Sequence, residues 1–139
     1  MLLYCGPAQR FIRPLGGISE VFRMYIVNYK EREECEVTMP GSRKVTMRWL
    51  VGKMTGATTY SMRRFEIQPG GIIPLHTHDE EHQIFVLRGH AKALGFPEGT
   101  VAKKDDVVFI PSGVEHGYDN TKGKEPFIFI CVIPLLEQD

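Results

Sequence analysis

Two short stretches of this chain decide its fold, PLHTHDEEHQIFVLRG at Pro74–Gly89 and IPSGVEHGYDN at Ile110–Asn120. Together they hold four of the five histidines, which are His76, His78, His82 and His116. Neutral imidazole is the commonest metal ligand in proteins near neutral pH. Three histidines at i, i+2 and i+6, with a fourth just after a Pro-Ser-Gly turn, therefore predict a single metal site.

Strand geometry allows these histidines to meet. Alternate residues of a strand share a face, so His76 and His78 are expected to point inward together. His82 has the same parity, but it follows a short acidic loop and begins a new strand. A tight turn at Pro111-Ser112-Gly113 precedes His116 and can aim it at the other three.

Short apolar runs alternate with turn signals from about Gly41 onward. The predicted strands are 45–51, 60–67, 84–87, 90–94, 107–110 and 126–134, and the second is expected to end at the Gln68-Pro69-Gly70-Gly71 turn. Many short strands separated by turns predict an all-β antiparallel sandwich or barrel. The last run is apolar on both faces, which predicts cover on both sides from the N-terminal arm or from a second subunit.

The first part of the chain lacks this pattern. Ser19 can cap a helix over about residues 19–34, although a strand over 21–27 fits nearly as well. Acidic residues at the end of such a helix oppose its dipole. We therefore divide the chain into an arm at residues 1–43, carrying this helix, and a barrel at residues 44–139.

Composition limits the functional classes. A chain of 139 residues forms one domain, and its 17 basic and 17 acidic residues give no electrostatic footprint for nucleic acid or a membrane surface. No apolar run is long enough to span a bilayer, and the start resembles no signal peptide. The odd number and wide spacing of Cys5, Cys35 and Cys131 do not indicate a disulfide framework, so we expect a cytoplasmic protein.

The two histidine stretches resemble the paired motifs of the cupin superfamily. Gly70, His76, His78 and Gly89 fit the first motif, and Pro111, Gly113, His116 and Asn120 fit the second. Asp105 stands where the second motif begins with glycine, and His82 stands where the first motif has glutamate. The resemblance implies a double-stranded β-helix, that is, a jelly-roll or cupin barrel, and a homodimer. It covers the middle of the chain and says nothing about residues 1–43.

The histidine at position 82 is similar to that of a four-histidine cupin subgroup. Glu81 is the alternative carboxylate ligand, but the spacing to Gly89 selects His82 and strand parity turns Glu81 away. Four neutral imidazoles leave the site more positive than three histidines with a glutamate, and they remove an internal proton acceptor. The resemblance favours manganese or iron, while imidazole ligands also suit nickel, copper or zinc.

The expected function is a metal-dependent oxidoreductase of the dioxygenase type that acts on a small organic substrate. The alternatives are a non-redox isomerase or lyase and a non-catalytic module that binds a sugar or another small molecule. Phe129 and Cys131 are expected to line the substrate pocket, and Tyr118 is a candidate proton donor that fits core packing better. Arg48, Arg63 and Arg64 are candidates for meeting an anionic substrate, and the sequence does not rank them.

Overall fold

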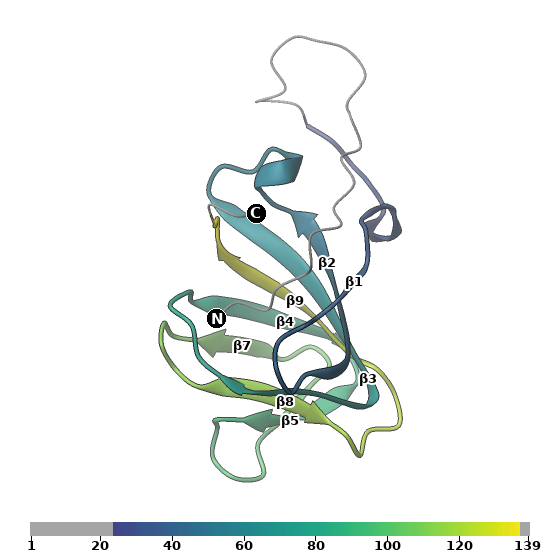
Figure 1. Cartoon of the computed structure of the whole chain (residues 1–139), viewed down its shortest axis with the longest axis vertical. Coiled ribbons are helices and arrows are strands. Elements are labelled where there is room, and N and C mark those ends of the chain that lie inside the picture. Colours follow the sequence, from purple (N-terminus) through teal and green to yellow (C-terminus); the bar gives the residue numbers. More distant parts are fainter. Residues whose placement is uncertain (1–23, 137–139) are drawn as a thin grey trace.

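The computed structural model describes residues 24–136, whose regular secondary structure is almost entirely β-strand (Figure 1). Within this range there is no α-helix, and the only helical turns are the 3-10 segments Tyr29–Glu31 and Lys53–Thr55. The strands are β1 (Cys35–Glu36), β2 (Arg43–Val51), β3 (Tyr60–His76), β4 (His82–Arg88), β5 (His90–Leu94), β6 (Val101–Lys103), β7 (Val107–Ile110), β8 (His116–Asn120) and β9 (Phe127–Pro134). The all-β prediction is confirmed.

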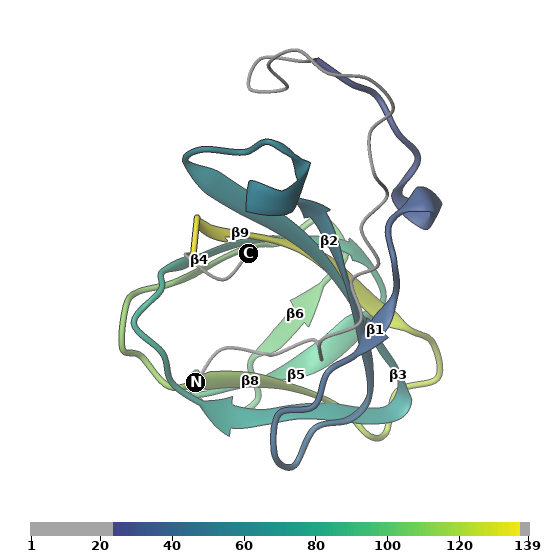
Figure 2. The same cartoon turned by 45° about the horizontal axis from the view of Figure 1, so that its top comes forward.

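The strands pair in an order that closes a barrel. All the pairs are antiparallel, in the order β6-β5-β8-β3-β9-β4-β7, and β2 adds a further partner to β3. Neighbouring strands such as β3 and β9 are far apart in sequence. The sheet curls so that β5 and β8 face β4 and β9 across the interior, giving the nearly closed jelly-roll barrel that was expected (Figure 2).

The long strand β3 runs through a segment that the sequence indicated as a turn. Its first part pairs with β2 and β9, ending at Ile67 opposite Phe127, and its second part pairs with β8 from Gly71 onward. Gly70 has a φ of +83°, and a Cβ on Gly71 would lie 2.8 Å from the backbone oxygen of Gln68. The glycines therefore bend the strand without ending it, and the bend carries His76 to the far side of the barrel.

Aromatic side chains fill the interior beneath the histidines. Phe65 of β3 stacks on Phe129 of β9 with ring centroids 5.1 Å apart, and Tyr118 of β8 lies 5.2 Å from Phe129. On β9 the inward residues are fully buried, whereas the outward Ile130 and Val132 are half-buried. The cover expected over the outer face of the last strand is therefore only partial within the described chain.

The helix predicted over residues 19–34 is wrong for its described part. Residues 24–28 are neither helical nor extended in a sheet, and only Tyr29–Glu31 forms a single 3-10 turn, capped by Asn28. Residues 19–23 lie outside the described range. Arg64 of β3 lies 4.4 Å from the Tyr29 ring, and Arg48 of β2 lies 5.8 Å from it. These contacts with the sheet fix an extended path that local helix propensity cannot overcome.

Two further features differ from what the sequence indicated. Short strands β6 and β8 were not predicted, because polar and glycine residues interrupt their apolar pattern. Cys131 is free and buried, as expected for a core cysteine, but Cys35 is disulfide-bonded, which its spacing did not indicate. Among residues 24–136, no helix has the length and apolar character needed to cross a membrane. The cytoplasmic location stays a prediction.

Candidate metal centre

The ends of three strands place the histidines. His76 is the last residue of β3 and pairs with His116, the first residue of β8, while His82 begins β4. His78 lies in the connection between β3 and β4, and its carbonyl accepts a hydrogen bond from Gly113 N at 2.9 Å. That bond ties the first motif to the Pro-Ser-Gly turn of the second. The structure therefore brings all four predicted histidines together.

The imidazole rings form one cluster. The His76 and His116 ring centroids are 4.4 Å apart, and those of His78 and His82 are 4.2 Å apart. Across the cluster, His82 and His116 are separated by 5.1 Å. The ligand atoms of three of them, His76, His78 and His116, all lie within 4.8 Å of one another. A separation of this size is compatible with binding to a shared ion.

Backbone carbonyls orient two of the rings. His76 Nδ1 donates to Pro74 O at 2.9 Å, and His116 Nδ1 donates to Val114 O at 2.8 Å, since a carbonyl can only accept. Each Nε2 therefore carries no proton and has a free lone pair that can bind a metal. Both Nε2 atoms are buried without a hydrogen-bond partner. Such outer hydrogen bonds are typical of histidines that bind metals. The buried, unpartnered nitrogens fit a divalent transition metal.

His82 lies in the cluster but contacts an arginine. Its Nε2 is 3.3 Å from Nη2 of Arg63, and because a guanidinium only donates, His82 Nε2 accepts. His82 Nε2 is thus occupied by Arg63, and His82 is not one of the three histidines whose ligand atoms converge within 4.8 Å. The part of His82 as a fourth ligand stays a prediction.

In the acidic loop between His78 and His82, the carboxylate near the histidines is Glu80 and not Glu81, the alternative ligand. Glu81 is exposed and accepts a hydrogen bond from Gln83 at 3.2 Å. By contrast, Glu80 lies with Oε2 3.4 Å from His78 Nδ1, although without the geometry of a hydrogen bond. It is therefore Glu80 that brings a negative charge close to the cluster. The sequence alone does not single out Glu80, because it stands in a run of three acidic residues in a loop.

Burial keeps the cluster uncharged. It lowers the pKa of both His78 and His116 to about 4, because the imidazolium loses hydration inside the barrel. The pKa of His82 is lowered by the same desolvation and further by the positive charge of Arg63. Desolvation also lowers the pKa of His76. All four rings are neutral at pH 7, which is the form that binds metals.

A small cavity adjoins the cluster. Its volume is about 10 Å³, and it is lined by Phe65, Ile73, Ile84, Tyr118 and Phe129 together with His76, His82 and His116. Phe129 lines this cavity, whereas Cys131 does not line it and instead lies 3.3 Å from Arg63 Nη2. That Phe129 contacts a substrate stays a prediction. This volume is about that of one water molecule. A larger ligand therefore requires the lining side chains to move.

Tyr118 has a more prominent place than core packing alone requires. Its hydroxyl is buried and has no hydrogen-bond partner, although its ring packs against Phe127 and Phe129. Burial raises the pKa of Tyr118 well above its usual range, so the hydroxyl keeps its proton. A protonated phenol in the cavity wall is a hydrogen-bond donor that lacks an acceptor.

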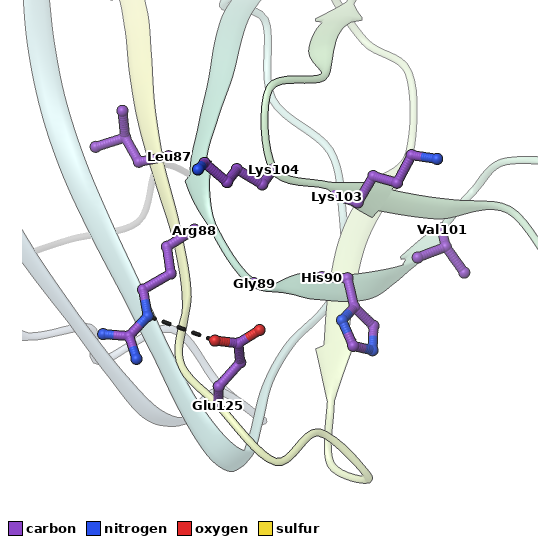
Figure 3. A pocket seen from close by; sticks show the side chains of 8 residues that line it. All are labelled: Leu87, Arg88, Gly89, His90, Val101, Lys103, Lys104 and Glu125. Carbon is purple, nitrogen blue, oxygen red and sulfur yellow. Dashed lines mark ion pairs between the residues drawn. The ribbon is translucent and has the colours of Figure 1, made fainter.

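A larger groove lies elsewhere, on the outer surface. Figure 3 shows this groove, of about 640 Å³, crossed by an ion pair between Arg88 and Glu125. Its lining residues are Leu87, Arg88, Gly89, His90, Val101, Lys103, Lys104 and Glu125. None of the clustered histidines lines it, and His90 is an exposed surface residue, as expected. The chemistry therefore concentrates in the small interior cavity.

Residues 63–133 match the family model of the cupin domain, which covers half of the chain and both histidine motifs. This chain is a cupin. The matched region runs from Arg63 on β3 to Ile133 on β9, so it contains all four clustered histidines of the cupin together with Tyr118.

Solved structures agree with the family. The polyketide cyclase RemF from Streptomyces resistomycificus is 29% identical, covering 82% of this cupin and 81% of that chain, with a TM-score of 0.75. A predicted oxalate decarboxylase from Thermotoga maritima is 28% identical over 81% of this cupin and 100% of that chain, with a TM-score of 0.65. A cupin 2 domain-containing protein from Halorhodospira halophila is 30% identical over 68% and 64% of the two chains, with a TM-score of 0.58. No curated protein matches the sequence.

Proposed function

We propose that this cupin is a metal-dependent enzyme of the lyase or cyclase type that acts on a small, enolisable carbonyl compound. One observation carries the proposal: the ligand atoms of three imidazoles, two of them buried and one half-buried, converge within 4.8 Å, next to a cavity whose wall includes the unpartnered Tyr118 hydroxyl. A divalent metal held there would supply a Lewis acid that polarises a carbonyl oxygen.

The histidines define the metals that fit. His76, His78 and His116 would hold the ion through Nε2 or, for His78, either ring nitrogen, and His82 would join them once its Nε2 leaves Arg63. Imidazole ligands suit iron, nickel, copper and zinc, and are a poor choice for magnesium or calcium. Three histidines leave one position open even on four-coordinate zinc, while iron or manganese with six ligands keeps open positions with three or four.

The protein side chains supply the rest of the chemistry. The Tyr118 hydroxyl can donate a hydrogen bond to an oxygen that gains negative charge, and its raised pKa keeps the proton available. None of the residues that line the cavity is a carboxylate, and Glu80, the carboxylate near the cluster, lies against His78 instead. This absence favours 1,3-dicarbonyl substrates, which enolise without a strong base. Exclusion of water by Phe65 and Phe129 strengthens each polar contact.

The comparisons support substrates with carbonyl or carboxyl oxygens. A polyketide cyclase and a predicted oxalate decarboxylase are both similar to this cupin over about four-fifths of its length. Dioxygenase activity, the first expectation from the sequence, is the second candidate. The apolar cavity wall favours it, because dioxygen is small and apolar and needs no base to bind.

Metal loading in the presence and absence of air distinguishes these two functions. The protein is loaded in turn with zinc, iron and manganese and incubated with a set of 3-oxo acids and linear polyketones, and products are followed by mass spectrometry. The proposal expects turnover with zinc, without dioxygen, and products formed by ring closure or loss of carbon dioxide. Turnover only with iron or manganese, accompanied by oxygen uptake, would favour the dioxygenase instead.

We also propose that the cupin is a homodimer, as the family resemblance implied. Phe85, Val107 and Phe109 are exposed on the outer face of β4 and β7, and β7 lies at the edge of the sheet. Val107 is 76% exposed although it lies directly opposite Phe85, so two apolar side chains share an open surface. A second copy of the chain, pairing its own apolar face there, would cover them. Light scattering should give twice the chain mass for the wild type and a single chain mass for Val107→Glu with Phe109→Glu; a wild-type monomer contradicts the proposal.

A further inference from the structure

One buried positive charge near the histidines, that of Arg63, has no acidic partner among the described residues. Arg63 lies on β3, points into the barrel and is 0% exposed. Its Nη2 lies 3.3 Å from both His82 Nε2 and Cys131 Sγ, while Nε and Nη1 have no hydrogen-bond partner. Among residues 24–136, no carboxylate forms an ion pair with it.

The neighbours of Arg63 are poor compensation for a charge. Its guanidinium carbon lies 5.0 Å from the ring centroid of Phe65 and 5.5 Å from that of Trp49. Cation–π contacts of this kind are weak beside the loss of hydration of a buried ion, and sulfur is a weak acceptor. Arginine stays protonated at any physiological pH, so the charge cannot be discarded. An unpaired guanidinium is therefore a cost in the protein without ligand.

The histidine cluster makes this cost larger. A divalent ion held by the neutral imidazoles would place two positive charges near Arg63, because Arg63 contacts His82 of the same cluster. The carboxylate close to the cluster is Glu80, which lies against His78 rather than against Arg63. An anion that bound near the guanidinium would offset both positive charges.

We infer that Arg63 is the anion-binding residue of the site, and that the substrate carries a carboxylate that pairs with it. This inference rests on the proposed function, and it narrows the substrates from carbonyl compounds to oxo acids. Arg63 is not among the residues that line the small cavity, so the ligand reaches it only once the lining side chains move. The carbonyl end would then lie toward the histidines and Tyr118, and the carboxylate toward the unpartnered Nε and Nη1 of Arg63. Displacement of Arg63 Nη2 from His82 Nε2 by the carboxylate would also free His82 for the metal.

The neighbouring Arg64 supplies a matched control. It points to the outer face of β3, where Nη1 forms an ion pair with Glu66 Oε2 at 3.0 Å and the guanidinium lies over Tyr29. Adjacent residues of one strand therefore carry the same side chain, one paired outside the barrel and one unpaired inside it. Replacing each by methionine removes the same charge from two different settings.

Binding of matched probes to zinc-loaded protein tests the inference. Acetoacetate and acetoacetamide differ in charge but hardly in shape, and calorimetry gives the affinity of each. The wild type and Arg64→Met should both bind acetoacetate at least about tenfold more tightly than acetoacetamide, because a charged hydrogen-bonded pair is worth that much or more. Arg63→Met should lose this preference while keeping its metal content and its affinity for acetoacetamide. Arg63→Lys, which keeps the charge, should retain part of it and serves where the methionine variant does not fold.

The outcomes separate this inference from the proposed function. Equal preference for acetoacetate in the wild type and Arg63→Met, with zinc bound in both, overturns the inference, whether or not the enzyme turns over. Loss of the preference in Arg63→Met supports it, even where no product forms with any substrate, which would count against the proposed function alone.

Discussion

The two faces of β3 treat positive charge in opposite ways. On the outer face, Arg64 pairs with Glu66, and Arg48 of the neighbouring strand pairs with Glu34 at 3.1 Å. On the inner face, Arg63 has no acidic partner and contacts a histidine of the metal centre. The outer arginines hold the N-terminal segment against the sheet, which is a structural role. The inner arginine, which lacks an acidic partner among the described residues, is the one that we infer pairs with a carboxylate from outside the chain.

The largest expected effect is the loss of bound metal when a histidine inside the barrel is replaced. His116→Ala is expected to abolish stoichiometric metal binding, because loss of a ligand costs more than the tenfold to roughly hundredfold lost with an outer hydrogen bond. Metal analysis of the purified protein measures it, with exposed His90→Ala as the control. His82→Ala and Glu81→Ala complete the series: metal loss in Glu81→Ala alone would contradict the assignment of His82.

The cavity wall gives the next effect. Tyr118→Phe removes a hydroxyl that has no partner in the folded protein, so the thermal midpoint should stay level or rise slightly. Turnover should fall by about 100-fold if the hydroxyl donates to the developing oxyanion. Steady-state kinetics and thermal unfolding on the same preparation separate these results. Unchanged turnover would return Tyr118 to a packing role.

Replacing the inner and the outer arginine should change the free energy of unfolding in opposite directions. Arg63→Met should stabilise the ligand-free protein, by about 1–4 kcal/mol if the site repacks well, since a buried unpaired charge is exchanged for a hydrophobic side chain. Arg64→Met removes a mostly buried ion pair and a ring contact and should destabilise by up to about 1 kcal/mol. Chemical unfolding of both variants without metal measures the contrast, and a destabilised Arg63→Met would show that Arg63 has a structural partner after all.

Acid should weaken the interior selectively. The folded protein holds His78 and His116 with a pKa of about 4, whereas unfolded histidines titrate near 6.5. Between these values the unfolded chain binds more protons, so stability of the metal-free protein should fall as the pH drops from about 6.5 to 4. Unfolding with denaturant at a series of pH values measures this slope. A flat profile for the wild type would contradict the buried, neutral cluster.

Much of the site was visible in the sequence because local spacing governs it. Strand alternation and the turn before His116 were enough to group four histidines, and the motif count preferred His82 over Glu81, which the structure leaves exposed. Two predictions were wrong: a helix over the described part of residues 19–34, and a strand that stops at residue 67 before the Gln68-Pro69-Gly70-Gly71 segment. In both, contacts with distant strands outweigh a local signal: Tyr29 rests on Arg64, and β3 gains new partners from β8 after its bend.

The sequence by itself determined the barrel and the grouping of the four histidines, because alternation within strands and the turns between them are local patterns. The tertiary structure decided which of three arginines faces the site, which acidic residue approaches His78, and which atom of His82 is occupied. The contacts of Arg63 and His82 depend on the register between strands that are remote in sequence, such as β3, β4 and β9, whereas the approach of Glu80 to His78 depends on the conformation of the loop between β3 and β4. Strands that are remote in sequence take their register when their apolar faces pack together in the barrel, so the pattern within any one of them does not give it.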